Sequence, residues 1–121
     1  MNSKPKFHII APVLPSLNID RDIIWYKEKT GFEVIYQEGG YAVLSRENLW
    51  IHLQWHAGTN EDPFHGSVIK IFIEGIDIIF QEFIKRGAVT KDKLKYNTPW
   101  HTNEFGFFDL NKNAIFFVED V

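Results

Sequence analysis

The sequence predicts an α+β protein built from two βαβββ modules that follow one another along the chain. Three observations support this. One amphipathic helix pattern occurs in each half, alternating apolar runs flank both helices, and a polar connector rich in Gly, Asn, Asp and Pro separates the halves. Such an internal repeat is hard to obtain by chance in 121 residues. We therefore expect a single domain at 1–121, with module one at 5–56, a linker at 57–66 and module two at 67–121.

The first half predicts a strand, a helix and three further strands. An apolar run at 7–13, closed by Pro15, predicts the first strand. Asn18 suits the N-cap of a helix at 19–30, and Gly31 suits its C-terminal end. The three later strands are predicted at 32–37, 41–45 and 49–55, joined by short turns.

The second half repeats the order. Residues 68–73 alternate, with Ile69, Ile71 and Ile73 predicted toward the core and Val68, Lys70 and Phe72 on the opposite face. A helix is predicted at 76–86, with Gly87 as its stop. An irregular strand at 88–94 and a hairpin made of 104–108 and 114–118 complete this half.

The stretch 49–56 has two chemically different faces. As a strand it places Leu49, Ile51, Leu53 and Trp55 on one side and Trp50, His52, Gln54 and His56 on the other. The first face is typical of a core. The second mixes aromatic, imidazole and amide groups, which suits the lining of a ligand cleft.

Composition excludes several function classes. The net charge of −3 and the absence of basic runs give no electrostatic reason to expect a nucleic-acid or membrane partner. With no cysteine there is no thiol catalysis, disulfide or thiolate metal site. The polar start at 1–6 is unlike a signal peptide, and no apolar run reaches transmembrane length. We therefore expect a cytoplasmic protein.

Four groups of residues together resemble a known family. They are 12–16, 25–26 with 30–34, 73–77 with 85–87, and 99–100 through 104–105 to Asp109 and Asn113. In order and spacing they are similar to the glyoxalase / bleomycin-resistance / extradiol-dioxygenase superfamily, also called vicinal oxygen chelate proteins. The resemblance implies a mixed sheet curled around a cleft, with helices on its outer face. It also implies a homodimer whose clefts are completed across the subunit boundary.

The same resemblance implies where a metal would bind in the enzymes of the superfamily. Carried over residue by residue, the ligand positions fall on Ala11, His52, Val68 and Phe116. Three of these four side chains have no metal-donor atom, so we expect no metal and no other cofactor. Within the superfamily the sequence most resembles the bleomycin-resistance type, which binds and sequesters its drug without a metal.

The residues predicted to bind the ligand are Trp50, His52, Gln54, Lys70, Phe72, Trp100, His101, Glu104 and Phe116. The aromatic members would supply contact area, while His52, Gln54 and Lys70 would orient a polar ligand. For the aromatic residues, core packing is the alternative. For Lys70, the alternative is an exposed sheet edge from which the ammonium reaches solvent.

The predicted function is metal-free binding of an aromatic or glycopeptide-like small molecule. No nucleophile–base–acid set and no phosphate-binding glycine loop occur in the sequence, which favours binding over catalysis. The alternative is a glyoxalase-like lyase or isomerase, or a dioxygenase-related enzyme, whose metal site is rearranged onto His52, His101 and Glu104. A third alternative is a non-binding relative that serves as an interaction module.

Overall fold

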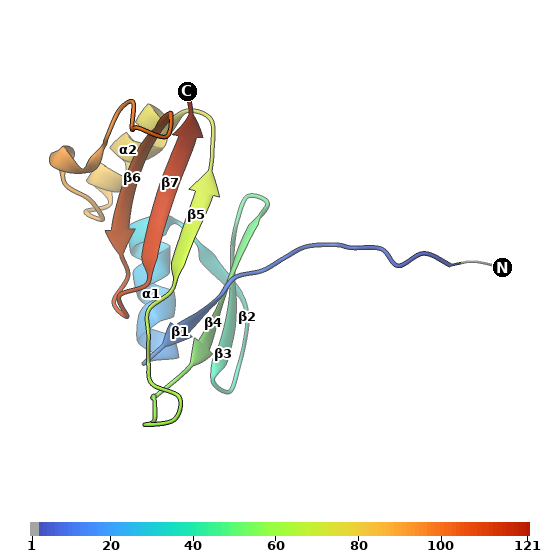
Figure 1. Cartoon of the computed structure of the whole chain (residues 1–121). Coiled ribbons are helices and arrows are strands. Elements are labelled where there is room, and N and C mark those ends of the chain that lie inside the picture. Colours follow the sequence, from blue (N-terminus) through green and yellow to red (C-terminus); the bar gives the residue numbers. More distant parts are fainter. Residues whose placement is uncertain (1–2) are drawn as a thin grey trace.

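The computed structural model describes residues 3–121 and contains two β-sheets, two α-helices and one short 3₁₀ helix (Figure 1). The four-stranded sheet has the order β1-β4-β3-β2, with β1 (Val13–Ser16), β2 (Glu33–Glu38), β3 (Tyr41–Arg46) and β4 (Leu49–Trp55). The three-stranded sheet has the order β5-β7-β6, with β5 (Val68–Phe72), β6 (Thr102–Phe108) and β7 (Ala114–Asp120). The helices are α1 (Ile19–Thr30), α2 (Ile76–Lys85) and η1 (Lys91–Lys93). The predicted α+β class is confirmed, whereas the division at 57–66 stays a prediction.

Helix α1 begins and ends where the sequence predicts. The side chain of Asn18 accepts a hydrogen bond from the backbone N–H of Arg21, and Gly31 ends the helix in the left-handed conformation at φ 75°. Helix α2 ends one residue earlier than predicted, with Arg86 as its C-cap and Gly87 at φ 74°.

The first strand lies later in the chain than predicted. Residues 7–12 form no strand, and β1 instead includes Pro15, the residue predicted to close it. Proline is tolerated because β1 is an edge strand paired only with β4, so its missing N–H breaks no second ladder. The chain before β1 runs away from the body as an extended segment, drawn in blue in Figure 1, which we call the N-terminal arm (residues 3–12).

The predicted strand at 88–94 is also absent. The chain there forms η1, and among residues 3–121 the single pairing of this segment with the sheet is an isolated bridge between Lys95, just beyond it, and Glu104. The Thr90 hydroxyl bonds to the Asp92 carboxylate, a local contact that favours a turn over a strand. As a result, the second sheet has three full strands where the first has four.

One hydrophobic core serves both modules. Helices α1 and α2 and the inner faces of both sheets contribute to a single cluster, which includes Tyr26, Phe32 and the aromatic group Phe80, Phe83, Phe105, Phe107 and Phe117. Ile51 and Leu53 of β4 lie in this core, as predicted, but Trp55 is 55% exposed. The prediction for Trp55 was wrong because β4 continues past the core, and there the backbone N–H of Trp55 donates a 2.7 Å hydrogen bond to the carbonyl of Gly40. Among the described residues, no helix has the length and apolarity needed to cross a membrane.

Candidate functional site

The face of the three-stranded sheet that is turned away from the helices and the core, which we call its outer face, carries a platform of side chains set in rows by the strand register. One row runs from Lys70 through Phe116 to Gly106, because Phe116 pairs with both neighbours. A second row runs through Phe72, Val118, Glu104 and Lys95, the last joined by the isolated bridge. Residues directly opposite each other in neighbouring strands point to the same face. The register therefore gathers aromatic, basic and acidic groups on one surface.

Gly106 allows Phe116 to lie close to the sheet. A Cβ built on Gly106 would come within 2.5 Å of two carbons of the Phe116 ring. Any side chain at 106 would therefore push the ring away. The flat ring leaves open space above this part of the platform.

A cavity of about 480 Å³ occupies that space. One wall is the segment 87–95, which turns away from the sheet because it forms η1 and not a strand. The lining includes Ala88, Thr90, Lys93, Lys95, Glu104, Gly106, Phe108 and Phe116. Its size lies within the range of about 300–1,000 Å³ that is typical of small-molecule sites.

Glu104 is the most enclosed polar residue of this cavity, with 9% of its surface exposed. Its Oε2 accepts hydrogen bonds from Trp100 Nε1 at 3.0 Å and from Thr102 Oγ1 at 2.8 Å. These two donors fix the orientation of the carboxylate. The Trp100 ring itself is 59% exposed in the loop before β6.

The rim of the cavity is charged. Lys93 and Lys95 line it, and neither has a carboxylate within 4.0 Å in the part of the chain that the structure describes. Asp92 lies in the same turn. The hydrogen bond from the Thr90 hydroxyl, together with its own backbone amide and the nearby lysines, holds the pKa of Asp92 below its usual range.

The remaining predicted residues lie outside this cavity. Trp50, Lys70 and Phe72 border a hollow of about 240 Å³ between β4, β5 and the base of the N-terminal arm. Gln54 borders another of about 310 Å³, beside His56 and the 62–65 segment. His52 lies on the outer face of the four-stranded sheet, where its Nδ1 is 2.6 Å from the Tyr41 hydroxyl. His101 is exposed in a turn at φ 65°.

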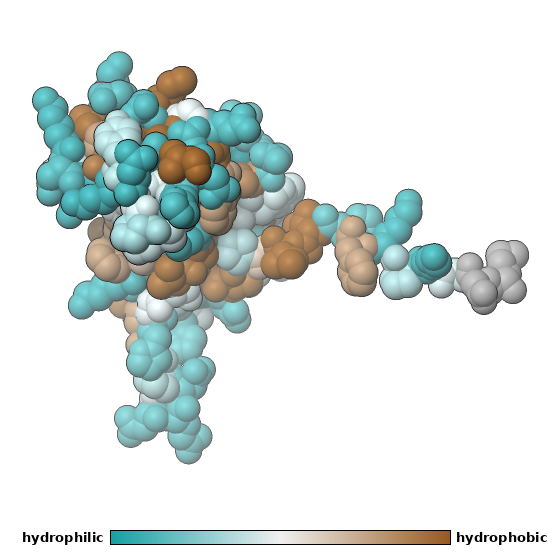
Figure 2. Space-filling model, turned by 45° about the horizontal axis from the view of Figure 1, so that its top comes forward, coloured by the Kyte–Doolittle hydropathy of each residue, from teal (hydrophilic) through white to brown (hydrophobic). Residues whose placement is uncertain are grey.

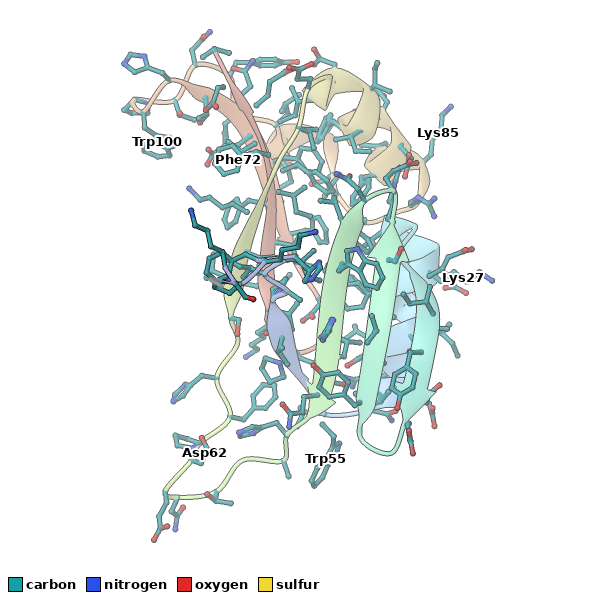
Figure 3. The ribbon with its side chains drawn as sticks, turned by 90° about the vertical axis from the view of Figure 1, so that its right-hand side faces the viewer. Lys27, Trp55, Asp62, Phe72, Lys85 and Trp100 are labelled. Atoms are coloured by element: carbon teal, nitrogen blue, oxygen red, sulfur yellow. The ribbon has the colours of Figure 1, made fainter. Side chains whose placement is uncertain are left out.

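A single chain therefore does not bring all nine predicted residues together. Glu104 and Phe116 share the 480 Å³ cavity, with Trp100 bonded to Glu104 beside it. Figure 3 shows Phe72 and Trp100 toward one end of the molecule and Trp55, at the end of β4, toward the other.

Sequence reasoning missed Gly106, Phe108, Lys93 and Lys95. Period-two alternation from Glu104 would have placed Gly106 and Phe108 on the same face, so that signal was present. The two lysines could not be found in this way. Their positions depend on the turn at η1 and on the bridge between Lys95 and Glu104, and neither is predicted by an alternating or helical pattern in the sequence.

The residues at the positions implied for a metal do not fit one. Ala11, Val68 and Phe116 offer only carbon atoms, and Val68 points outward with 66% exposure. The proposed rearranged set is not assembled either. Among residues 3–121, no three His, Cys, Asp or Glu side chains come together in a way that could hold an ion. His52 and Glu104 lie on different sheets.

Comparison with known proteins agrees with this architecture. No family model matches the chain. Bleomycin resistance proteins of Geobacillus stearothermophilus and Staphylococcus aureus are 27% identical over 125 residues, covering 91% of this chain and 95% of theirs.

Solved structures show the same fold. The bleomycin resistance determinant encoded on transposon Tn5 aligns with a TM-score of 0.79 at 16% identity, over 94% of this chain and 98% of that one. A bleomycin-binding protein complexed with bleomycin gives 0.76 at 13% identity, over 95% and 100%. A glyoxalase-related enzyme from Clostridium phytofermentans gives 0.72 at 18% identity, over 99% and 100%.

The fold is thus the one seen in these bleomycin-resistance, bleomycin-binding and glyoxalase-related structures. The predicted resemblance of the sequence to the bleomycin-resistance type is confirmed by its similarity to the Geobacillus and Staphylococcus proteins.

Proposed function

We propose that this protein binds a small molecule in the manner of the bleomycin-resistance type, without a metal and without transforming it. The observation that carries the proposal is the 480 Å³ cavity on the outer face of the three-stranded sheet, with its aromatic floor and enclosed carboxylate. The 27% identity to bleomycin resistance proteins over 91% of the chain supports it independently. The predicted cytoplasmic location stays a prediction.

The ligand is an aromatic or glycopeptide-like molecule, and bleomycin is the first candidate. A planar group would lie against Phe108 and Phe116, where aromatic contact contributes area and geometric preference. Polar groups of the ligand would meet Glu104 and the two rim lysines. Trp50, His52, Gln54, Lys70, Phe72 and His101 lie outside this cavity in one chain and would take part from the surface of a second copy.

The working form is a homodimer in which a second copy completes the binding surface. The N-terminal arm supports this, because Phe7 is 95% and Ile10 98% exposed, too much apolar surface for a segment that stays in water. Hydrophobic side chains, brown in Figure 2, gather where the arm joins the body. Ten extended residues reach about 33 Å, far enough to lie on a neighbouring subunit. A dimer would also bring the separate hollows of two chains together.

Thermal unfolding with and without bleomycin tests the proposal. A ligand that binds only the folded state at 100 times its Kd stabilises it by about 2.7 kcal/mol, which raises Tm by several degrees. No shift with bleomycin or with a broad library of aromatic and glycopeptide compounds would favour the interaction-module alternative.

Metal analysis separates binding from the enzyme alternative. Protein purified without chelator should contain no stoichiometric zinc, nickel, iron or manganese. A stoichiometric metal that disappears in His52→Ala would contradict the metal-free proposal and favour a glyoxalase-like enzyme.

A further inference from the structure

The cavity above the three-stranded sheet has a polar wall formed by the Glu104 carboxylate, whose two oxygens differ in their hydrogen bonds. Glu104 Oε2 is bonded to Trp100 and Thr102, but no described protein group donates to its Oε1. Among residues 3–121, the only fully enclosed side-chain nitrogen or oxygen that lacks a partner is His56 Nδ1. Oε1 of Glu104 is therefore not fully enclosed, and Glu104 is one of the residues that line the cavity. A carboxylate oxygen that is this enclosed gains most from an ionised or strongly polar donor.

The two rim lysines offer the opposite charge next to this carboxylate. Lys95 is directly opposite Glu104 in the isolated bridge, so their Cβ atoms are about 4.5–5.5 Å apart on the same face. Their charged ends nevertheless form no salt bridge, and Lys93 lines the same rim without one. Asp92 is the acidic residue of this turn, and its carboxylate accepts a hydrogen bond from the Thr90 hydroxyl.

Apart from Thr90, whose hydroxyl donates a hydrogen bond to Asp92, the rest of the cavity lining is apolar. Ala88, Phe108 and Phe116 line it, and Gly106 keeps the Phe116 ring close to the sheet. One cavity therefore combines three features: a hydrogen-bond acceptor on the wall, two cations at the rim and a flat apolar floor. Each feature would contact a different part of one ligand.

We propose that this cavity selects a zwitterionic ligand, in which an ammonium or amine donates to Glu104, a carboxylate faces Lys93 and Lys95, and an aromatic body lies on Phe116 and Phe108. The inference rests on the proposed small-molecule binding and names the chemical class that the site prefers. An α-amino acid bearing an aromatic ring, free or as the end of a larger molecule, meets all three requirements.

Three probes with the same ring separate the contributions. Tryptophan carries both charges, tryptamine only the ammonium, and indole-3-propionate only the carboxylate. NMR titration of the full chain with each probe, up to about 10 mM, measures affinities in the weak range expected of fragments. Wild-type protein should bind tryptophan about tenfold more tightly than either of the other two, because a hydrogen bond between charged groups contributes about that much.

Two variants assign the charges to residues. Glu104→Gln keeps an oxygen for Trp100 and Thr102 and should weaken tryptophan and tryptamine about tenfold, leaving indole-3-propionate unchanged. Lys93→Ala with Lys95→Ala should weaken tryptophan and indole-3-propionate about threefold to fivefold and leave tryptamine unchanged. Lys91→Ala, in the same turn but not lining the cavity, is the matched control and should change none of the three.

Equal affinities for the three probes, or an equal loss for all of them in Glu104→Gln, would overturn the inference. If Glu104→Gln fails to fold, the wild-type series and the lysine variant still test it. Binding of bleomycin with no binding of any probe would overturn the zwitterion preference and leave the proposed function standing. Binding of neither would remove both.

Discussion

The hydroxyl of Tyr26 in α1 donates a 2.6 Å hydrogen bond to Oδ2 of Asp109, in the turn between β6 and β7. Both residues are buried, and they belong to different halves of the chain. The same carboxylate accepts from the side chain of Asn113, which also donates to the carbonyl of Pro15 in β1. This network joins the first helix and first strand to the last hairpin. It fixes how the cavity-bearing sheet sits relative to the other sheet.

Replacing Tyr26 with Phe should lower the free energy of unfolding by about 1–3 kcal/mol. The ring volume is kept, but Asp109 loses a donor in a buried setting, where an unmet partner is costly. Chemical denaturation measures the change. Tyr96→Phe is the matched control because Tyr96 also bonds an aspartate, Asp77, but on the exposed surface. That variant should stay within about 0.5 kcal/mol of wild type, and equal losses in both would contradict the role given to the buried bond.

The ion group of Glu82, Arg46 and Arg86 predicts an acid dependence. Arg46 donates hydrogen bonds of 2.6 and 2.7 Å to the two carboxylate oxygens of Glu82, and Arg86 donates one of 2.8 Å to its Oε2. Hydrogen bonding from Arg46 first, and also from Arg86, lowers the pKa of Glu82 from 4.5 to about 2. Because the folded-state pKa is depressed, the stabilisation is complete above about pH 4.5 and is lost as the pH falls toward 2.

Glu82→Gln should therefore be less stable than wild type by about 1 kcal/mol at pH 7, since the group is partly exposed. The difference should shrink between pH 4.5 and pH 2. Urea denaturation across this range measures it. Glu74→Gln serves as the control, because Glu74 is exposed and makes no side-chain hydrogen bond or salt bridge within the described chain. A difference that stays constant with pH would show that the carboxylate charge is not the cause.

Gly106→Ala should disturb the floor of the cavity. The added methyl group would overlap the Phe116 ring, so the ring must move into the cavity at a cost of about 1–3 kcal/mol. In a Phe116→Ala background the overlap is gone, and the cost of Gly106→Ala should fall by more than about 0.5 kcal/mol. A double-mutant cycle of unfolding free energies tests this. An equal loss of stability in both backgrounds would show that overlap with the Phe116 ring is not the cause.

Removing residues 1–10 should convert the proposed homodimer to monomers. The deletion takes away the exposed Phe7, Ile9 and Ile10 and leaves β1 intact. Light scattering coupled to size exclusion measures the mass. Replacing the same three residues with Ser should have the same effect without shortening the chain. A full-length protein that is already monomeric at high concentration would contradict the dimer.

The sequence was most informative where structure depends on neighbours along the chain. Helix α1 has the predicted bounds because Asn18 and Gly31 are local signals, and β4 has the predicted bounds because its alternation is strict. The first strand was predicted to end before Pro15, but proline ends a strand only where its missing N–H is needed for pairing. At the sheet edge, where β1 lies, that N–H is not needed. The segment 88–94 was predicted to be a strand, but its conformation is set by the turn at η1 and by a single bridge to the sheet.

The candidate site was less predictable than the fold. Glu104 and Phe116 lie beside one cavity because of the pairing register of β6 and β7. The alternation of apolar and polar residues within each strand does not predict this register. Trp50 and Lys70 face another hollow, and nothing local in the sequence distinguishes the two. In the proposed dimer a second chain would bring these surfaces together, and no pattern within one sequence predicts how two copies are arranged.

Isothermal titration of the full-length protein with bleomycin tests the central proposal most directly. We expect saturable binding to the apo protein in metal-free buffer, with a negative heat-capacity change from the burial of apolar surface and weaker binding in Gly106→Ala. The absence of any saturable heat, at protein and drug concentrations at which the folded state is verified, would contradict it.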